Sequence, residues 1–247
     1  MPKKLDYRAV WADARALFAA HKEAMVAIAG FFIFMPAWIS AFFVPSFMVD
    51  TLGSADKVMA TLSGYFQAFW PILLPTMLVA LYGSLSLYVL LSGRVLAKVG
   101  DVFAIAGIIF VPYLLASIII GWSVLAGLFL FFIPGLYLAG RFAVMPAIIA
   151  QENGGGTSGA IRRAWQVTSK CGWAVLILML FVTVVMRLLA GIAGGVVEAI
   201  CQAIAGADGI PIVQSAITAL FVAGEAVAYV LMLVAINRQL SAQTVPQ

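Results

Sequence analysis

Two ionisable residues, Arg187 and Glu225, lie inside long apolar stretches of the chain, where charge is unexpected. If those stretches cross a bilayer as helices, Arg187 lies roughly 24 Å beyond Cys171, and Glu225 lies roughly 20 Å before Arg238. A charge at the bilayer centre costs at least about 2.5–3.5 kcal/mol, so an opposite charge at matching depth is its natural partner. We therefore predict an Arg187–Glu225 ion pair, which is either a substrate or proton site or a structural link between two helices.

Small residues close to this pair predict how the two helices meet. Gly191 and Gly195 form a Gly-x-x-x-Gly pattern, which lets two membrane helices approach closely. Gly191 falls on the same stripe of the helix as Arg187. The sequence therefore predicts a tightly packed pair formed by the last two helices.

Three arginines, Arg141, Arg162 and Arg163, are candidates for contact with lipid phosphate. Arg141 lies about 28 Å beyond Trp122 at helical rise, which is close to the thickness of a bilayer core and places it among the headgroups. There it would bind lipid phosphate, pair with Glu152, or extend to the interface as a simple anchor. Arg162 and Arg163 belong to a short basic segment that is typical of a helix lying on the membrane surface.

Residues for metal or covalent chemistry are scarce. One histidine and two cysteines cannot supply the three or four ligands of a zinc site. The sequence contains no Gly-rich loop with a lysine for cradling phosphates, and its acidic residues do not pair in a way that would hold Mg²⁺. We therefore predict no metal, no cofactor and no catalytic residue, and expect the chain not to be an enzyme.

The elements that carry these residues must be membrane helices. Of the 247 residues, 64% are hydrophobic and only 10% are charged, and the mean hydropathy is +1.11. Soluble domains are about 45–50% apolar and about 25% charged, so this composition excludes a water-soluble globule. The net charge of +4 is small and is not gathered in a patch that would indicate nucleic-acid binding.

The spacing of charges predicts an all-α, polytopic transmembrane bundle of six helices. Residues 1–23 form a basic amphipathic interfacial helix, 24–238 form the membrane domain, and 239–247 form a tail. Gly121-Trp122 is expected at a hairpin tip. Residues 54–70 are expected as a short helix or loop on the far surface, because Pro71 and Pro75 would interrupt a helix, and the alternative is that they belong to a longer span. The expected spans are about 24–44, 72–92, 102–120, 122–140, 172–197 and 212–236.

The distribution of Lys and Arg predicts the orientation. Six spans put both termini on one side, together with twelve of the fourteen basic residues, whereas the other side receives only Lys57. Positive loops stay in the cytoplasm, so both termini are expected to be cytoplasmic. The twelve are Lys3, Lys4, Arg8, Arg15, Lys22, Arg94, Lys98, Arg141, Arg162, Arg163, Lys170 and Arg238.

Residues 134–168 carry a familiar order of residues. Pro134 and Gly135 are expected to break the helix that carries them. An arginine, a proline, a glutamate and an Ala-x-x-Arg segment follow, as Arg141, Pro146, Glu152 and Ala160-Ile161-Arg162-Arg163. This order resembles the YciC-like inner-membrane proteins and the related membrane domain of glycerophosphoryl diester phosphodiesterases. Ala164 stands where the family often has serine, so no hydroxyl role carries over to that position.

The resemblance implies a multi-pass protein of the bacterial cytoplasmic (inner) membrane rather than a defined reaction. We expect a non-enzymatic protein in envelope or lipid homeostasis, or an accessory membrane subunit. The alternative is a small transporter or permease with a path near the broken fourth helix and Arg187 and Glu225. The expected partners are the lipid bilayer and anionic phospholipid headgroups, with a membrane-protein partner or a second copy of the chain, and no nucleic acid.

Overall fold

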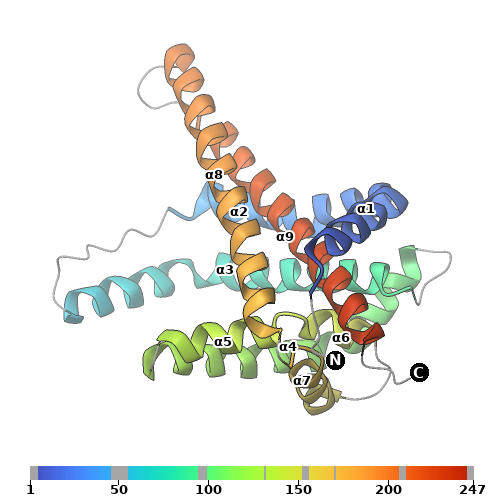
Figure 1. Cartoon of the computed structure of the whole chain (residues 1–247). Coiled ribbons are helices and arrows are strands. Elements are labelled where there is room, and N and C mark those ends of the chain that lie inside the picture. Colours follow the sequence, from blue (N-terminus) through green and yellow to red (C-terminus); the bar gives the residue numbers. More distant parts are fainter. Residues whose placement is uncertain are drawn as a thin grey trace.

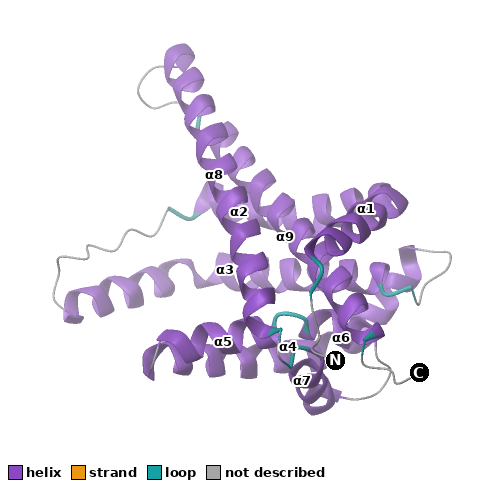
Figure 2. Cartoon of the chain, in the orientation of Figure 1, coloured by secondary structure: helices purple, strands orange, loops and turns teal. Residues whose placement is uncertain are grey.

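The protein is helical throughout the part of the chain that its computed structural model describes. This part comprises residues 5–45, 55–93, 99–130, 132–151, 156–169, 171–205 and 210–243. The described residues outside the helices form short loops and turns, which are drawn in teal in Figure 2. The elements are α1 (Tyr7–Ala29), the π-helical turn η1 (Gly30–Phe34), α2 (Met35–Phe43), α3 (Ala55–Leu91), α4 (Val99–Leu130), α5 (Phe132–Phe142), α6 (Met145–Gln151), α7 (Gly156–Val167), α8 (Gly172–Ala205) and α9 (Pro211–Ala242).

Among the residues that the structure describes, six helical stretches are long and apolar enough to cross a membrane, which confirms the predicted all-α, multi-pass class. They are Tyr7–Phe43, Asp56–Leu91, Val99–Leu130, Phe132–Gln151, Gly172–Ile204 and Pro211–Ala242. The 37 residues of α3 rise about 55 Å, well above the roughly 30 Å of a bilayer core. In Figure 1, α8 and α9 run up and down the view whereas α3 and α5 run across it, so the helices cross steeply.

The first helix does not end at the boundary predicted at residue 23. Asp6 caps its start, because the Asp6 carboxylate accepts hydrogen bonds from the backbone N–H groups of Arg8 at 2.9 Å and Ala9 at 3.3 Å. From there α1 continues to Ala29 and leads through η1 into α2. Residues 7–23 of the predicted interfacial helix and the first span are therefore parts of one helical stretch.

The expected separation of 54–70 from a span at 72–92 is wrong. α3 runs without interruption through Pro71 and Pro75. Membrane helices tolerate proline because neighbouring helices and hydroxyl groups provide polar partners for the disturbed turn. Here the hydroxyl of Thr76, one residue after Pro75, donates to the backbone carbonyl oxygen of Ile72 at 2.7 Å in this turn and accepts a 2.9 Å hydrogen bond from Ser40 of α2.

The expected hairpin tip at Gly121-Trp122 is also wrong. α4 continues through both residues to Leu130, and α5 begins only at Phe132. Glycine is common inside membrane helices, so a Gly-Trp pair does not end a helix by itself. The tip therefore lies about ten residues later than the span boundary between 102–120 and 122–140.

The last two helices are longer than predicted. α8 extends to Ala205, beyond the expected end at residue 197, and α9 begins at Pro211 and ends at Ala242. α9 therefore includes the first residues of the expected tail 239–247. Residues 244–247 of that tail lie outside the described part.

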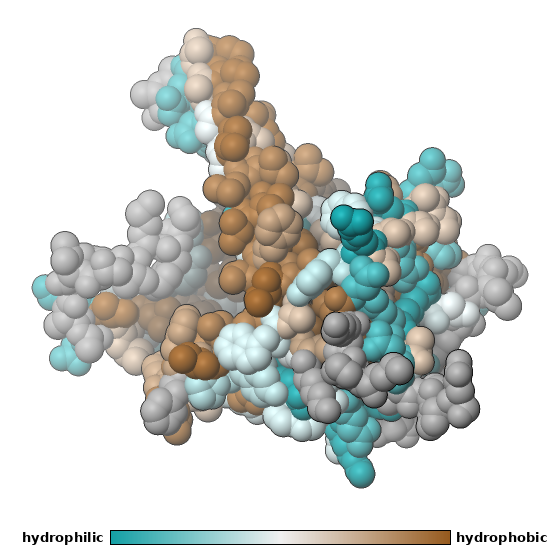
Figure 3. Space-filling view, viewed as in Figure 1, coloured by the Kyte–Doolittle hydropathy of each residue, from teal (hydrophilic) through white to brown (hydrophobic). Residues whose placement is uncertain are grey.

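The buried core lies where α1, α3, α6, α7 and α9 meet. Every residue of α9 from Val230 to Asn237 is buried, and so are Leu85 and Val89 of α3 and Ala164 of α7. α8 differs, because its apolar side chains remain largely exposed and form the brown surface of the upper part of Figure 3. In a membrane protein such a surface faces lipid.

The first span crosses α3 at Gly83. Phe32 of η1 packs so closely there that a Cβ atom on Gly83 would overlap the Cβ atom of Phe32. The Phe32 ring lies 5.7 Å from the ring of Tyr82 and 5.2 Å from that of Phe103. Tyr82 in turn donates a 2.9 Å hydrogen bond to the carbonyl oxygen of Phe103, which links α3 to α4.

Candidate functional site

The structure brings Arg187 and Glu225 together between α8 and α9. Arg187 Nη2 lies 3.3 Å from Glu225 Oε2. The two side chains differ in exposure, because that of Arg187 is 67% accessible and that of Glu225 only 14%. The carboxylate is therefore enclosed by the protein, while most of the guanidinium faces outward.

A second polar contact lies one helical turn from this pair. The hydroxyls of Thr183 and Tyr229 are hydrogen-bonded to each other, and Thr183 also donates to the carbonyl oxygen of Met179 at 3.1 Å. Because Thr183 precedes Arg187 by four residues and Tyr229 follows Glu225 by four, both contacts lie on one seam of an antiparallel pair. Polar side chains thus join α8 and α9 at two successive turns.

The expected role of Gly191 and Gly195 in helix packing is wrong. A Cβ atom added at either glycine would meet no atom within 4 Å, so no helix approaches there. Close contact between α8 and α9 occurs instead at Gly224, where an added Cβ would lie 3.3 Å from Met186 Cε. At this point of the seam, Met186 of α8 therefore packs against Gly224 of α9.

Arg141 is buried inside the protein, which corrects the predicted phosphate contact and the anchor alternative. The residue is only 4% exposed. Its Nη2 donates to the carbonyl oxygen of Trp165 at 2.8 Å, and its Nη1 donates to that of Thr168 at 3.4 Å and to the Tyr137 hydroxyl at 3.1 Å. Glu152, the other expected partner, lies outside the described residues.

This arrangement makes Arg141 a cap for the C-terminal end of α7. The last carbonyl groups of a helix have no partner within it and carry partial negative charge, so a buried guanidinium both satisfies and neutralises them. The guanidinium carbon also lies 3.9 Å from the centroid of the Trp165 ring. Thr168 closes the contact by donating to the carbonyl oxygen of Arg141 at 3.0 Å.

Pro134 and Gly135 begin a helix rather than break one. Pro134 is the third residue of α5, where the missing N–H has no partner to lose. Gly135 allows α5 to pack back on α4, because an added Cβ would lie 2.8 Å from Leu128 Cα. Gly127 makes the reciprocal contact, since its added Cβ would lie 2.9 Å from Gly135 Cα. Gly127 and Gly135 therefore allow α4 and α5 to pack closely against each other.

Arg162 and Arg163 lie on α7, which forms close to where the sequence predicts it. Arg162 is exposed, and Arg163 is half-buried. Arg162 borders a surface groove of about 500 Å³ that Phe142 and Trp165 also line. These two arginines, unlike Arg141, remain candidates for contact with headgroups.

Sequence reasoning missed the contacts of two neighbouring residues near the end of α9, Arg238 and Asn237, with other helices. Arg238 Nη2 donates to the carbonyl oxygen of Leu91, the last residue of α3, at 2.8 Å, and Arg238 Nη1 lies 3.9 Å from Asp13 Oδ1. Buried Asn237 Nδ2 donates to Gln151 Oε1 at 2.6 Å. No local pattern signals either contact, because the partners lie 86 or more residues apart in the sequence.

Within the described ranges, no three His, Cys, Asp or Glu residues gather in a way that could hold a metal ion. Cys171 and Cys201 are both buried and are not joined to each other by a disulfide. Fold and site together define a multi-pass membrane protein with two polar centres, one at Arg187 and Glu225 and one around Arg141. No family model, curated protein or solved structure matches the chain.

Proposed function

We propose that this chain is a non-catalytic multi-pass protein of a bacterial cytoplasmic membrane, of the YciC-like type, that acts in envelope or lipid homeostasis or as an accessory subunit. The observation that carries this proposal is that Arg141 holds two helices together. This arginine is the central charged residue of the 134–168 motif, and two of its hydrogen bonds hold α5 to the C-terminal end of α7. A group engaged in this way supports the fold and is not available to a substrate.

The proposed orientation puts both termini in the cytoplasm, and the helix ends that meet support the part of it that places both termini on one side. Arg238 near the end of α9 contacts the end of α3 and Asp13 near the start of α1. At the opposite ends, Trp38 Nε1 donates to Ser215 Oγ at 3.1 Å, which links α2 to the start of α9. If the chain crosses the membrane six times, the end of α9, the end of α3 and the start of α1 lie on one side. The end of α2 and the start of α9 then lie together on the other side. Reporter fusions at both termini test the orientation, and reporters in different compartments would contradict it.

The proposed role is tested by deleting the gene in the bacterium that encodes the chain and measuring phospholipid composition and sensitivity to envelope stress. We expect a change that is restored by the wild-type chain and equally by Arg187→Gln. The paired substitution Arg141→Gln should fail to restore it, because α7 loses its cap. Loss of restoration by Arg187→Gln alone, at normal protein level, would contradict a purely structural ion pair.

One observation favours the alternative of a transporter or permease. A guanidinium that is 67% accessible on a membrane helix faces either lipid or water, and lipid is costly for a charge. A water-filled path beside α8 would remove that cost. Single cysteines at Thr183 and Arg187, in a chain whose Cys171 and Cys201 are replaced by alanine, should then react with a membrane-impermeant thiol reagent, whereas a cysteine at Leu189, on the opposite face of α8, should not. Protection at all three positions supports the structural role.

A further inference from the structure

An apolar groove of about 520 Å³ lies between the first span and α9. Its floor is made by small residues on both helices, including Ala29 and Gly30 on one side and Ala223 and Gly224 on the other. A Cβ atom added at Gly30 would meet nothing within 4 Å, so the space over this glycine is open. The volume falls within the range of about 300–1,000 Å³ that is typical of ligand pockets.

The length of the groove matches one leaflet of a bilayer. Along α9 it extends from Leu220 to Leu231, which is about 16 Å at helical rise. Half of a bilayer core is about 15 Å thick. A partner helix that spans the membrane would need a groove about twice as long, so the dimensions favour an acyl chain.

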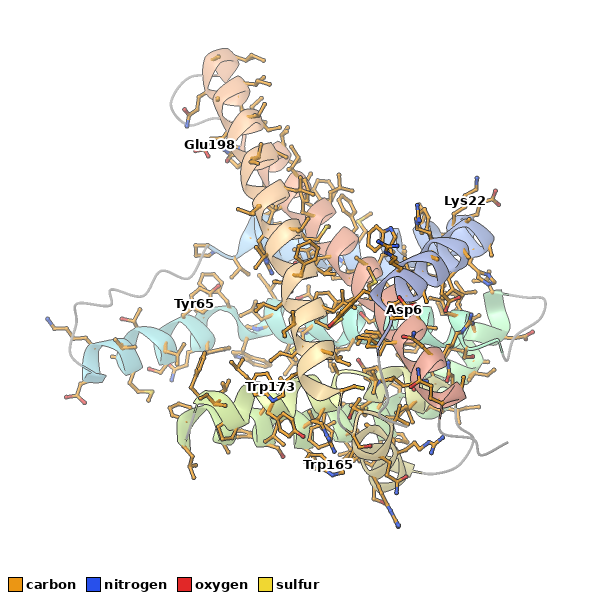
Figure 4. The ribbon with its side chains drawn as sticks, viewed as in Figure 1. Asp6, Lys22, Tyr65, Trp165, Trp173 and Glu198 are labelled. Atoms are coloured by element: carbon orange, nitrogen blue, oxygen red, sulfur yellow. The ribbon has the colours of Figure 1, made fainter. Side chains whose placement is uncertain are left out.

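The part of α1 between two of the groove residues supplies a polar site. Phe18 and Met25 both line the groove, and residues 19–24 between them line a separate hollow of about 540 Å³ together with Val99. This hollow contains His21, Lys22 and Glu23. Figure 4 shows Lys22 at the outer end of α1, where its side chain points away from the protein.

The charges near this end of the groove favour an anionic headgroup. Arg15 and Lys22 are exposed cations of α1, and Glu23 is the neighbouring carboxylate. The remaining acid of this part of α1, Asp13, lies 3.9 Å from Arg238 and is thereby balanced. One positive charge is left in excess, and a basic residue near a membrane surface contributes about 1 kcal/mol toward anionic lipid.

We propose that the groove between α1, η1 and α9 binds one acyl chain of an anionic phospholipid, whose phosphate is held by Lys22 with Arg15 nearby. The apolar groove accounts for the chain, and the hollow at residues 19–24 accounts for the headgroup. This inference requires residence in a membrane, and it does not depend on the proposed role in the envelope.

The test uses the full-length chain in nanodiscs that contain equal parts of phosphatidylglycerol and phosphatidylcholine with identical acyl chains. After mild delipidation, native mass spectrometry counts the lipids that remain bound. The wild-type protein should retain one phosphatidylglycerol. Lys22→Gln should lower the preference for phosphatidylglycerol about fivefold, because one basic residue is lost. Lys57→Gln, which removes an exposed cation from the start of α3, is the matched control and should leave the preference unchanged.

Filling the groove tests the position of the acyl chain. Gly30→Phe and Ala228→Phe introduce a ring from opposite walls, so both should abolish retention of the lipid, whereas Gly191→Phe fills open space on α8 and should not. Monodisperse elution and unchanged helical content show that each variant is folded. A lipid with a photoreactive acyl chain should label α1 and α9 in the wild type. The proposal would be overturned if both groove variants retained the lipid fully. It would also be overturned if the photoreactive lipid labelled only other helices, or if a second protein were crosslinked in the groove.

Discussion

Arg141 contacts Trp165 in two ways, because its Nη2 donates to the backbone carbonyl of Trp165 at 2.8 Å while its guanidinium carbon lies 3.9 Å from the centroid of the indole ring of the same residue. One side chain therefore fixes both the end of α7 and the position of its tryptophan. The path of the arginine is shaped by glycine, since a Cβ atom on Gly172 would lie 2.8 Å from Arg141 Cδ. The arrangement joins α5, α7 and the start of α8.

Replacing Arg141 by lysine should destabilise the protein even though the charge is kept. Lysine is a point charge and cannot donate to two carbonyl groups in the fork geometry that Arg141 uses. We expect a loss of about 1.5–3 kcal/mol in the free energy of unfolding, which is the range for a hydrogen bond that involves a charged group. A titration of unfolding in SDS measures it. Arg162→Lys, at an exposed position of α7, should change stability by less than about 0.5 kcal/mol.

Arg187 and Glu225 should show weak but measurable coupling. Interhelical polar contacts in membranes average about 0.6 kcal/mol, and the high exposure of Arg187 keeps its interaction with Glu225 near that value. Arg187→Gln, Glu225→Gln and the double variant form a double-mutant cycle, with SDS unfolding as the measurement. Strict additivity of the two single losses would mean that the ion pair makes no energetic contribution. Glu198→Gln, an exposed acid on the same helix, serves as a reference.

Gly83→Ala should disrupt the crossing between η1 and α3. The new methyl group would overlap the Cβ atom of Phe32, and forced overpacking typically costs about 1–3 kcal/mol. Phe32→Ala should not rescue this variant, because alanine keeps the offending Cβ atom, whereas Phe32→Gly should recover part of the lost contact. Gly64→Ala in the same helix meets nothing within 4 Å and should be neutral or slightly stabilising, as measured by thermal unfolding in detergent.

Some of this architecture can be predicted from sequence, and the limits have physical causes. The number of spans follows from long uncharged runs, because every buried peptide group in a bilayer must be hydrogen-bonded within a helix. The approximate depth of Arg187 and Glu225 follows from helical rise, so their contact could be anticipated. Boundaries are less predictable, because Pro71, Pro75 and Gly121 are compatible with a membrane helix once neighbouring helices pack against it.

The burial of Arg141 illustrates a different limit. An arginine near the end of a span can be either an anchor at the membrane surface or a buried cap of another helix. Only the path of α7 decides that Arg141 is a buried cap. That path depends on Gly140 and Gly172, which allow α5 and the start of α8 to touch. Contacts between distant segments leave no periodic signal, so the sequence alone favours the simpler interpretation of an arginine at the headgroups.

Asn237 and Gln151 should behave as an inseparable pair. Asn237 is 1% exposed and donates to Gln151 Oε1 at 2.6 Å, so replacing either residue by leucine leaves a polar group without its partner. An unsatisfied buried group costs about 1–3 kcal/mol, whereas replacing both partners with apolar groups of similar shape can be nearly neutral. We therefore expect Asn237→Leu and Gln151→Leu each to lower the midpoint of SDS unfolding, and the double variant to recover most of the loss. A double variant that is as unstable as the sum of the single ones would show that the side chains act independently, through other neighbours such as Ser241, whose hydroxyl donates to Asn237 Oδ1 at 3.4 Å.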